Sequence, residues 1–373
     1  MTSVARPGVM ATLGDARGLL PGVAVAAAIG AVATALGTVV PVVGAPVIAV
    51  LLGLLARTVL DRRGTAVPVG SAVPVGSAAP LGFADAGTAI HAGSRFAGRH
   101  VLQAAVVVLG TGLSVRSVLR TGVASLPVML GTLALCLVAA WLLGRLLRIP
   151  DPLRTLIGAG TGICGASAIA ALRGVVAADE VSVAYAVSTI VVYNITATVV
   201  FPPVGRLLGL SQHAFGLWAG TAVNDTSSVV ATGYAYGAAA GRYAVTVKLT
   251  RALMIIPVVL GVAARTRRAE RAADPVADRA AARTPLWRLV PPFLVLFLLA
   301  ASANSTGLIP AGWQGALARL AGYLVAVALA GVGLGVRVAE LRRAGLRPLL
   351  FGGLLSVLVA LGSLGLQALT ANW

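Results

Sequence analysis

The stretch LPVMLGTLALCLVAAWLLGRLL, residues Leu126–Leu147, decides the fold class. It is apolar almost throughout, and its one charged residue, Arg145, lies near its end. A run of about 20 apolar residues is what an α-helix needs to cross a lipid bilayer. The strands of a membrane barrel would instead alternate polar and apolar residues. The run therefore predicts a transmembrane helix.

Similar runs lie on both sides of this stretch. Hydrophobic residues make up 58% of the chain and charged residues 11%, with a mean hydropathy of +0.95. A soluble domain carries about 25% charged residues, so the composition excludes an ordinary soluble protein and also a disordered one. We expect an all-α, multi-pass protein in the lipid bilayer with about 10–11 transmembrane helices. The apolar runs are Val23–Val40, Val47–Leu60, Val101–Leu113, Leu126–Leu147, Thr155–Leu172, Val181–Val204, Phe215–Ala240, Tyr243–Ala264, Leu289–Ala303, Leu320–Val336 and Pro348–Leu369.

The formal net charge of +18 is spread over short basic clusters between these runs. Lys and Arg in short loops mark the cytoplasmic side of a membrane, so we expect a topology signal and no nucleic-acid partner. We place the protein in a bacterial inner membrane, with the N-terminus and both linkers on the cytoplasmic side. This topology leaves Arg116 and Arg120 on the opposite side, where the rule does not expect basic residues. The first apolar run is longer than the core of a signal peptide, and we interpret it as an uncleaved helix.

The chain divides into five predicted regions. They are N-terminal helices (1–60), a Pro/Gly/Ser-rich linker (61–99), a transport core (100–264), a basic linker (265–288) and C-terminal helices (289–373). The two cysteines lie in apolar runs and the three histidines lack ligand spacing, so we expect no disulfide, no metal site and no cofactor.

Two internal matches suggest repeated structure. Residues Leu109–Arg116 resemble Ala330–Arg337, and our topology makes these segments cross in opposite directions, as an inverted repeat requires. A tighter match aligns Ala159–Ala171 with Ala219–Ala231, since both begin AGT and carry Ser after five further residues. We expect the second match to form a pair of equivalent elements.

The first of these elements crowds Gly158, Gly160, Gly162 and Gly165 into one apolar run. Such spacing indicates either a broken or re-entrant helix or close helix packing. The polar neighbours Thr161, Cys164 and Ser167 favour the broken helix. The run also fits GxGxxG, but a dinucleotide site needs a preceding strand, which a membrane helix does not supply.

The second element carries Asn224-Asp225-Thr226-Ser227-Ser228. A carboxylate inside a membrane is costly and usually marks an ion path or has a buried partner. Lys248 and Arg251 lie on one face of the next helix, so we expect Asp225 and Lys248 to pair, either as a packing ion pair or in a substrate or proton site. Asn194 either bonds across helices or lines the site. The predicted site residues are Gly160, Thr161, Gly162, Cys164, Gly165, Ser167, Asn194, Asn224, Asp225, Thr226, Ser227, Ser228, Lys248 and Arg251.

Three segments carry a family resemblance. LIGAGTGICGASAIAA (Leu156–Ala171), GTAVNDTSSVVATGYAYG (Gly220–Gly237) with VKLTRALMIIP (Val247–Pro257), and GVGLGVRVAELRRAGLRPLL (Gly331–Leu350) resemble the YeiH-like sulfate exporter family of bacterial inner-membrane proteins. The resemblance implies export of sulfate or a sulfonate. Some members have a His-Glu pair at the place of Asn224-Asp225, so this chain keeps the acid and lacks the histidine.

These observations lead to one main functional hypothesis. We expect a secondary transporter of inverted-repeat type for a small oxyanion such as sulfate or a sulfonate, coupled to protons or sodium, because the sequence holds no ATP-binding motif and no motif of a hydrolytic enzyme. The alternatives are a cation/proton antiporter that uses Asp225, and a membrane scaffold or sensor that transports nothing. A homo-oligomer stays open.

Overall fold

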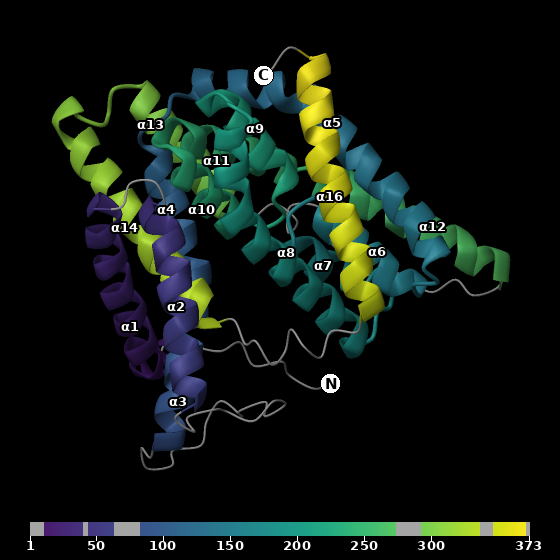
Figure 1. Ribbon diagram of the computed structural model, residues 1–373, viewed down its shortest axis with the longest axis horizontal. Helices are drawn as coiled ribbons and strands as arrows, with labels where there is room; N and C mark the ends of the chain where they lie inside the picture. Colours follow the sequence, from purple (N-terminus) through teal and green to yellow (C-terminus); the bar gives the residue numbers. More distant parts are fainter. Residues whose placement is uncertain (1–10, 40–43, 63–82, 274–291, 336–345, 371–373) are drawn as a thin grey trace, which may run out of the picture. The chain divides into compact units, whose positions relative to one another are not determined.

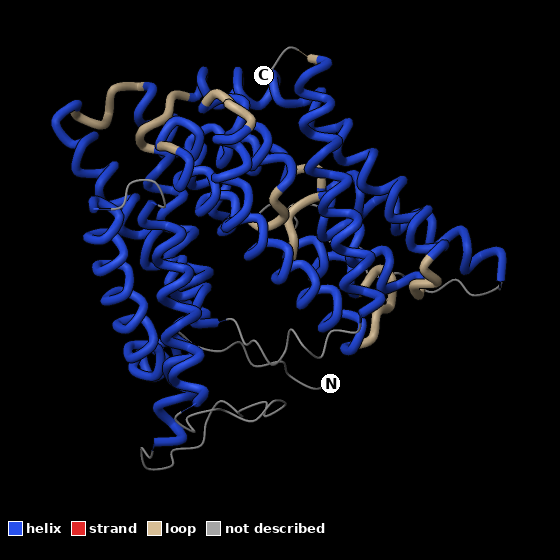
Figure 2. Tube along the Cα trace, in the orientation of Figure 1, coloured by secondary structure: helices blue, strands red, loops and turns tan. Residues whose placement is uncertain are grey.

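The described part of the chain is helical, with no strand in it (Figure 2). A computed structural model describes residues 11–39, 44–62, 83–273, 292–335 and 346–370. Within those residues, six helices are long and apolar enough to cross a membrane. They are Gly18–Thr38, Val115–Leu146, Glu180–Leu207, Ala238–Thr266, Gly312–Gly335 and Leu346–Leu369. The prediction of an all-α, multi-pass membrane protein is confirmed, although several predicted spans are shorter or broken helices.

The chain forms two compact units (Figure 1). Unit 1 comprises residues 1–105 and 319–338, and unit 2 comprises residues 106–318 and 339–373. Unit 1 holds α1 (Ala11–Val39), α2 (Gly44–Arg62), α3 (Phe83–Phe96) and the π-helix η1 (Ala97–Val101). Unit 2 holds α5 (Val115–Leu146), α6 (Asp151–Gly162), α7 (Ala166–Arg173), α8 (Glu180–Leu207), α9 (Gln212–Ala222), α10 (Thr226–Tyr236), α11 (Ala238–Ala252), α12 (Ile255–Ala273), α13 (Pro292–Ser305) and α16 (Leu346–Leu369). Helices α4 (Leu102–Gly110) and α14 (Ala311–Gly335) contribute to both units.

Close helix packing in unit 1 depends on glycine. A Cβ atom on Gly22 of α1 would lie 2.7 Å from the Cα atom of Gly93 of α3, so α1 and α3 touch backbone to backbone. Small residues allow such an approach in membranes, where packing rather than hydrophobicity holds helices together. This packing explains why the second half of the predicted linker 61–99 is a helix instead, whereas residues 63–82 lie outside the described part.

The predicted match between residues 109–116 and 330–337 takes two different local structures. Gly110 ends α4 and Gly112 lies in the turn after it, whereas Gly331 and Gly333 lie inside α14. A Cβ atom on Gly331 would lie 2.7 Å from the Ser94 carbonyl oxygen. Gly110, Gly331 and Gly333 serve helix packing. The end of the match, residues 336–337, lies outside the described residues.

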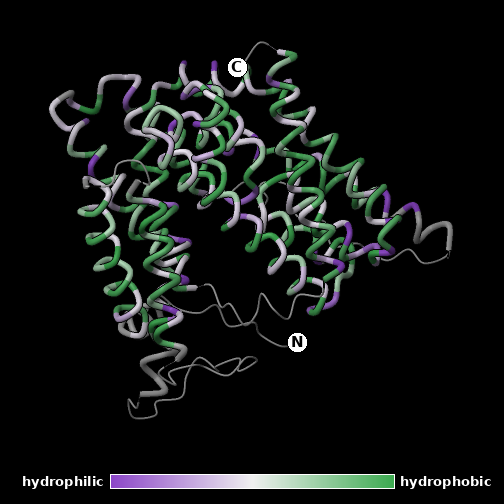
Figure 3. The backbone as a smooth tube through the Cα atoms, in the orientation of Figure 1, coloured by the Kyte–Doolittle hydropathy of each residue, from purple (hydrophilic) through white to green (hydrophobic). Residues whose placement is uncertain are grey.

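The outer surface of unit 2 is apolar. Val138, Leu142 and Leu361 are 63%, 57% and 61% exposed, and Figure 3 shows hydrophobic colour along most helices. A soluble protein does not expose so large an apolar area, so the surroundings of these side chains are lipid. Side chains of the N-cap residues fix where three of the helices begin. The hydroxyl of Ser114 accepts a backbone N–H in the first turn of α5, and that of Ser211 does so in α9. The carboxylate of Asp179 accepts a backbone N–H in the first turn of α8.

Candidate functional site

The first aligned element is a helix that breaks at Ile163–Gly165, between α6 and α7. Gly165 has φ +69° and ψ −127°, a conformation open to glycine and strained for other residues. The earlier glycines serve packing, since a Cβ atom on Gly158 would lie 2.6 Å from that of Ala140. The glycine cluster therefore does both things that its spacing suggested: Gly165 breaks the helix, and Gly158 allows close helix packing.

The second aligned element breaks at Val223–Asp225, between α9 and α10. Asp225 caps α10: its Oδ2 atom accepts the Ser227 N–H at 3.0 Å and the Ser227 hydroxyl. From α8, the Asn194 Oδ1 atom accepts the N–H groups of Asn224 and Asp225, each at 3.1 Å. Asn194 therefore bonds across helices and holds the second break in place.

The α9–α10 pair enters and leaves unit 2 on the same side. The Gln212 side chain, at the start of α9, donates to the Tyr236 carbonyl at 3.3 Å and accepts from the Ala240 N–H at 3.0 Å. The end of α10 and the start of α11 thus lie beside the start of α9. The pair is a re-entrant hairpin with its tip at Val223–Asp225.

The α6–α7 pair is a re-entrant hairpin from the opposite side. Helices α11 and α12 form a spanning segment that begins beside Gln212, and its far end is tied to the start of α6 by Arg265–Asp151 at 3.3 Å. Helix α8 spans between the end of α7 and the start of α9, so α7 ends on the side where α6 starts. The two hairpins are inverted copies of one another.

The two tips touch. A Cβ atom on Gly165 would lie 3.4 Å from the Cβ atom and 3.5 Å from the Cα atom of Asp225, its aligned residue. In Figure 2 the two breaks are the tan segments in the middle of unit 2. Equivalent residues of the two oppositely directed hairpins therefore meet at the tips.

Two buried cations from α11 bind both tips. Lys248 and Arg251 are each 0% exposed. The Lys248 ammonium donates to the carbonyl oxygens of Ile163 at 2.8 Å and Val223 at 2.9 Å, which are aligned residues. These carbonyls end α6 and α9, where the helix dipole leaves partial negative charge.

Arg251, one turn after Lys248 on α11, also binds one carbonyl of each hairpin. Its guanidinium donates to the Thr221 carbonyl and, at 3.4 Å, to the carbonyl of the aligned Thr161. The predicted Asp225–Lys248 ion pair is wrong for the residues that the structure describes, where Lys248 bonds carbonyls and Asp225 bonds Ser227. Helix ends satisfy the ammonium, and the first turn of α10 satisfies the carboxylate.

Three buried polar atoms around the tips have no hydrogen-bond partner among the described residues. They are the Thr161 hydroxyl, the Asn224 amide oxygen and the Arg251 Nε atom. An unsatisfied buried polar group costs about 1–3 kcal/mol, and a bound water, ion or ligand is one way to satisfy it. Asn224 is 2% exposed.

Exposure differs between the two sides of the tips. Ala166 and Ser167 are exposed, and Asp225 and Thr226 are half-buried, whereas Ser227 and Ser228 face inward. The Ser167 hydroxyl donates to the Cys164 carbonyl at 3.1 Å and to its thiol at 3.0 Å. The predicted residues therefore gather at one place, except that Gly160 and Gly162 contribute packing against Ile190 and Cys136.

Sequence reasoning missed the backbone groups. The carbonyls of Thr161, Ile163, Thr221 and Val223 bind the two cations, and carbonyls leave no trace in a sequence. The alignment of residues 159–171 with 219–231 was the signal that could have found them, because it pairs each of these residues with its equivalent.

Charges near the end of α7 are structural. Arg173 pairs with Glu180 at 3.2 Å, with both side chains exposed, so it is a helix-end cation. The hydrogen bonds of Ser182 hold the pKa of Asp179 below its usual value, as suits a carboxylate that caps α8.

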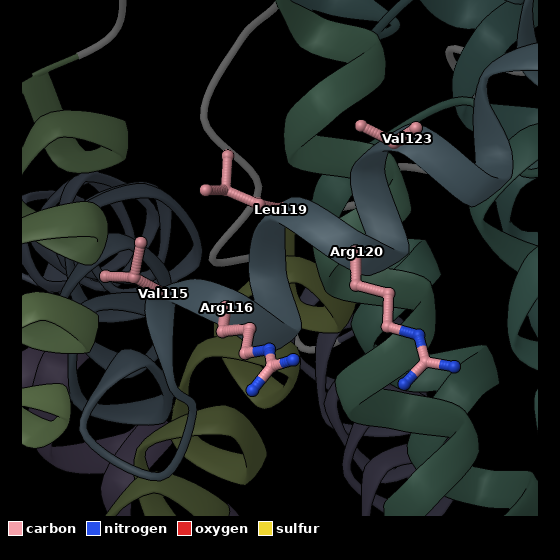
Figure 4. Close-up of a pocket in the computed structure, with 5 residues that line it drawn as sticks. All are labelled: Val115, Arg116, Leu119, Arg120 and Val123. Carbon is pink, nitrogen blue, oxygen red and sulfur yellow. The ribbon is translucent and has the colours of Figure 1, made fainter.

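A hollow on α5 lies apart from the hairpin tips. It is lined by Val115, Arg116, Leu119, Arg120 and Val123, all from the first turns of that helix (Figure 4). Figure 4 shows both guanidinium groups extending to the same side. Since the lining comes from one exposed helical stretch, we do not take this hollow as the candidate site. Substitutions of its two arginines serve instead as controls for variants elsewhere in unit 2.

Comparisons with known proteins find relatives among membrane proteins. Residues 79–352 match the family described as Conserved hypothetical protein 698. A "UPF0324 membrane protein" of Clostridium tetani is 37% identical over 286 residues, covering 75% of this chain and 83% of the relative. Proteins of that name from Streptococcus pyogenes serotype M6 and Streptococcus agalactiae serotype V are 36% and 33% identical over 341 residues, covering 89% of this chain and 92% of each relative. No solved structure matches. The YeiH-like family that the sequence resembles is this same family.

Proposed function

The chain belongs to the UPF0324 family of membrane proteins, and on that premise we propose that it is a secondary transporter for a small oxyanion. The observation that carries the proposal is the pair of buried cations joined to two inverted, broken hairpins. Broken helices meeting within a membrane protein expose backbone groups that bind ions, and alternating access needs such a paired site.

The charges at the tips favour an anion. Lys248 and Arg251 bring two positive charges, and their described partners are carbonyl dipoles. Asp225 brings one negative charge, which is turned toward Ser227. Since charge in a membrane interior is costly unless compensated, an anion bound at the tips completes the balance.

Each group has a role in this proposal. The tip amides and hydroxyls bind the oxyanion, Lys248 and Arg251 hold the hairpins and supply the positive field, and Asp225 carries the coupling proton. The family resemblance suggests sulfate or a sulfonate as substrate and export as direction. The protein would lie in the bacterial cytoplasmic membrane with its linkers inside, and would transport rather than catalyse.

Flux in proteoliposomes tests the proposal. We expect the purified protein to exchange ³⁵S-sulfate, with uptake that responds to an imposed pH gradient. Asp225→Asn should keep exchange but lose the response to the pH gradient by about tenfold or more, because the carrier of the proton is gone. Glu180→Gln, which changes an exposed carboxylate, is the matched control and should behave as wild type.

Two outcomes would contradict the proposal. If no oxyanion moves under any pH or sodium gradient, the protein is not this kind of transporter. If Asp225→Asn abolishes a sodium- or proton-driven cation exchange and sulfate never moves, the cation/proton antiporter is correct instead.

A further inference from the structure

Four arginines gather where α5 ends and where α6 and α12 meet it (Figure 1). This arginine cluster consists of Arg145 in the last turn of α5, Arg148 just after that helix, Arg154 in α6 and Arg265 in α12. The Asp151 carboxylate pairs with Arg154 and, at 3.3 Å, with Arg265. The cluster therefore sets four positive charges around one negative charge.

Packing fixes where two of these guanidinium groups lie. A Cβ atom on Gly144 would overlap the Arg154 side chain, which is only 12% exposed, so Arg154 lies against the last turn of α5. The Cζ atom of Arg145 lies 4.3 Å from the centroid of the Trp141 ring, one turn earlier on α5. A cation over the face of a tryptophan ring is attracted by it. The cluster is therefore a built surface.

Arg148 holds a backbone conformation that favours glycine. Its φ is +53°. The Ile149 N–H donates to the Gly144 carbonyl at 2.8 Å, and the Arg148 N–H donates to the Arg145 carbonyl at 3.1 Å. These two bonds close a Schellman motif, in which the residue at the place of Arg148 is usually glycine. Backbone strain of this kind points to a role for the side chain that bears it.

The cluster lies at the end of a membrane-spanning stretch. The apolar run Leu126–Leu147 is long enough for one crossing of the bilayer, and the cluster begins in its last turn. Leu142, on the preceding turn, is 57% exposed and Trp141 is 44% exposed. Tryptophan and arginine at the end of a span lie at the level of the lipid headgroups. The neighbours of this surface are therefore headgroups on one side and acyl chains on the other.

We infer that the arginine cluster binds the headgroup of an anionic phospholipid. Guanidinium groups bind phosphate oxygens through paired hydrogen bonds. Asp151 pairs with Arg154 and Arg265, and no carboxylate among the described residues pairs with Arg145 or Arg148. The lipid phosphate takes that place, and the acyl chains lie along the exposed apolar face of α5.

The excess of positive charge selects the kind of lipid. A zwitterionic headgroup brings its own cation to the cluster, whereas an anionic headgroup leaves a net negative charge for the arginines, as in basic pockets between membrane helices. The inference goes beyond the proposed function, because it concerns a lipid ligand at a surface apart from the hairpin tips and requires no transported solute.

Lipid binding to the purified full-length protein in detergent tests the inference. The unfolding midpoint is followed against phosphatidylglycerol, with phosphatidylcholine as the zwitterionic reference and sodium phosphate as a source of free phosphate. Phosphatidylglycerol should raise the midpoint saturably, and the other two should not.

Arg148→Gly separates lipid binding from folding. The variant loses a charged hydrogen-bond donor, so its apparent affinity for phosphatidylglycerol should fall about tenfold or more. Its unfolding midpoint without lipid should be at least that of wild type, because glycine suits the left-handed position. Arg116→Gln, which removes one positive charge from the first turn of α5, is the matched control and should leave the affinity unchanged.

Four results would overturn the inference. They are unchanged affinity of Arg148→Gly, an equal loss in Arg116→Gln, equal stabilisation by phosphatidylcholine, and equal stabilisation by sodium phosphate. The second would show attraction to overall charge, the third a general effect of lipid, and the fourth a site for a soluble anion. A lower unfolding midpoint of lipid-free Arg148→Gly would show that Arg148 serves the fold instead.

Discussion

Lys248 links two helix ends that are far apart in the sequence. Its ammonium bonds the carbonyl oxygens of Ile163 and Val223, the first residue of each break, at 2.8 and 2.9 Å. A lysine is almost never fully buried without partners, and here carbonyl dipoles replace a carboxylate. The side chain therefore matters first for the assembly of the tips and through them for any ligand.

Replacing Lys248 should unfold this assembly. Lys248→Ala leaves two buried carbonyls without a donor, and bonds to a charged group are worth about 1.5–3 kcal/mol each, so we expect a loss of about 3 kcal/mol or more in the free energy of unfolding. Unfolding in a detergent titration measures it. Arg242→Ala, at an exposed position of the same helix, is the control. Equal stability of the two variants would show that the ammonium does not hold the tips.

At the scale of single residues, the sequence showed which side chains were exceptional but not their partners. Asp225, Lys248 and Arg251 stand out because charge is rare in apolar runs. Their pairing was inferred from opposite charge alone. The structure instead matches each charge with backbone dipoles at helix ends, and a dipole becomes visible only when the place of the break is known.

Helices α9 and α11 pack backbone to backbone through a pair of glycines. A Cβ atom on Gly216 would lie 2.8 Å from the Ala240 carbonyl oxygen, and one on Gly220 would lie 2.8 Å from the Cβ atom of Val247. Glycines four residues apart let membrane helices approach closely. This contact positions α11, and with it Lys248, against the second tip.

Widening that contact should weaken the protein. Gly220→Ala forces α9 away from α11, and overpacking of this kind costs about 1–3 kcal/mol. Gly261→Ala in α12 is the matched control, because nothing lies within 4 Å of a Cβ atom there. It should be neutral or slightly stabilising. Thermal unfolding of both variants in detergent measures the difference, and a Gly220→Ala protein as stable as wild type would contradict the packing described.

Element by element, the breaks were predictable and the added helix α3 was not. Gly165 and Asp225 lie in a matched pair of segments, and a repeated pattern of small and polar residues inside apolar runs marked both breaks. Helix α3 follows a Pro/Gly/Ser-rich tract, and its composition does not separate it from a linker. It is a helix because α1 offers Gly22 for Gly93 to pack against, which is a tertiary reason.

Across the whole molecule, unit 2 is organised by two hairpins that enter from opposite sides. The start of α6 is tied to Arg265 of α12, and the start of α9 to the end of α10. A chain of apolar runs could have been a plain bundle of crossing helices. The number of predicted spans could not decide this, because each hairpin looks like one full crossing in hydropathy.

Labelling of single cysteines from each side of the membrane tests the hairpins. In a protein with Cys136 and Cys164 replaced, we expect Leu146→Cys and Gly174→Cys to react with an impermeant thiol reagent from one side. Leu208→Cys and Ala239→Cys should react from the other side, because each pair flanks one re-entrant hairpin. If the two members of either pair react from opposite sides, that segment crosses the membrane completely.

The two carbonyl bonds of Lys248 also couple the positions of the two hairpins. In the proposed transporter, a hairpin that retracts to open a path from its own side would give up one of the two carbonyl bonds, and the ammonium would stay with the other hairpin. Retracting both at once would leave a bare charge in the membrane, the most costly state of all. On this basis the tips of the proposed transporter would withdraw one at a time, and a continuous pore would be excluded without a separate gate.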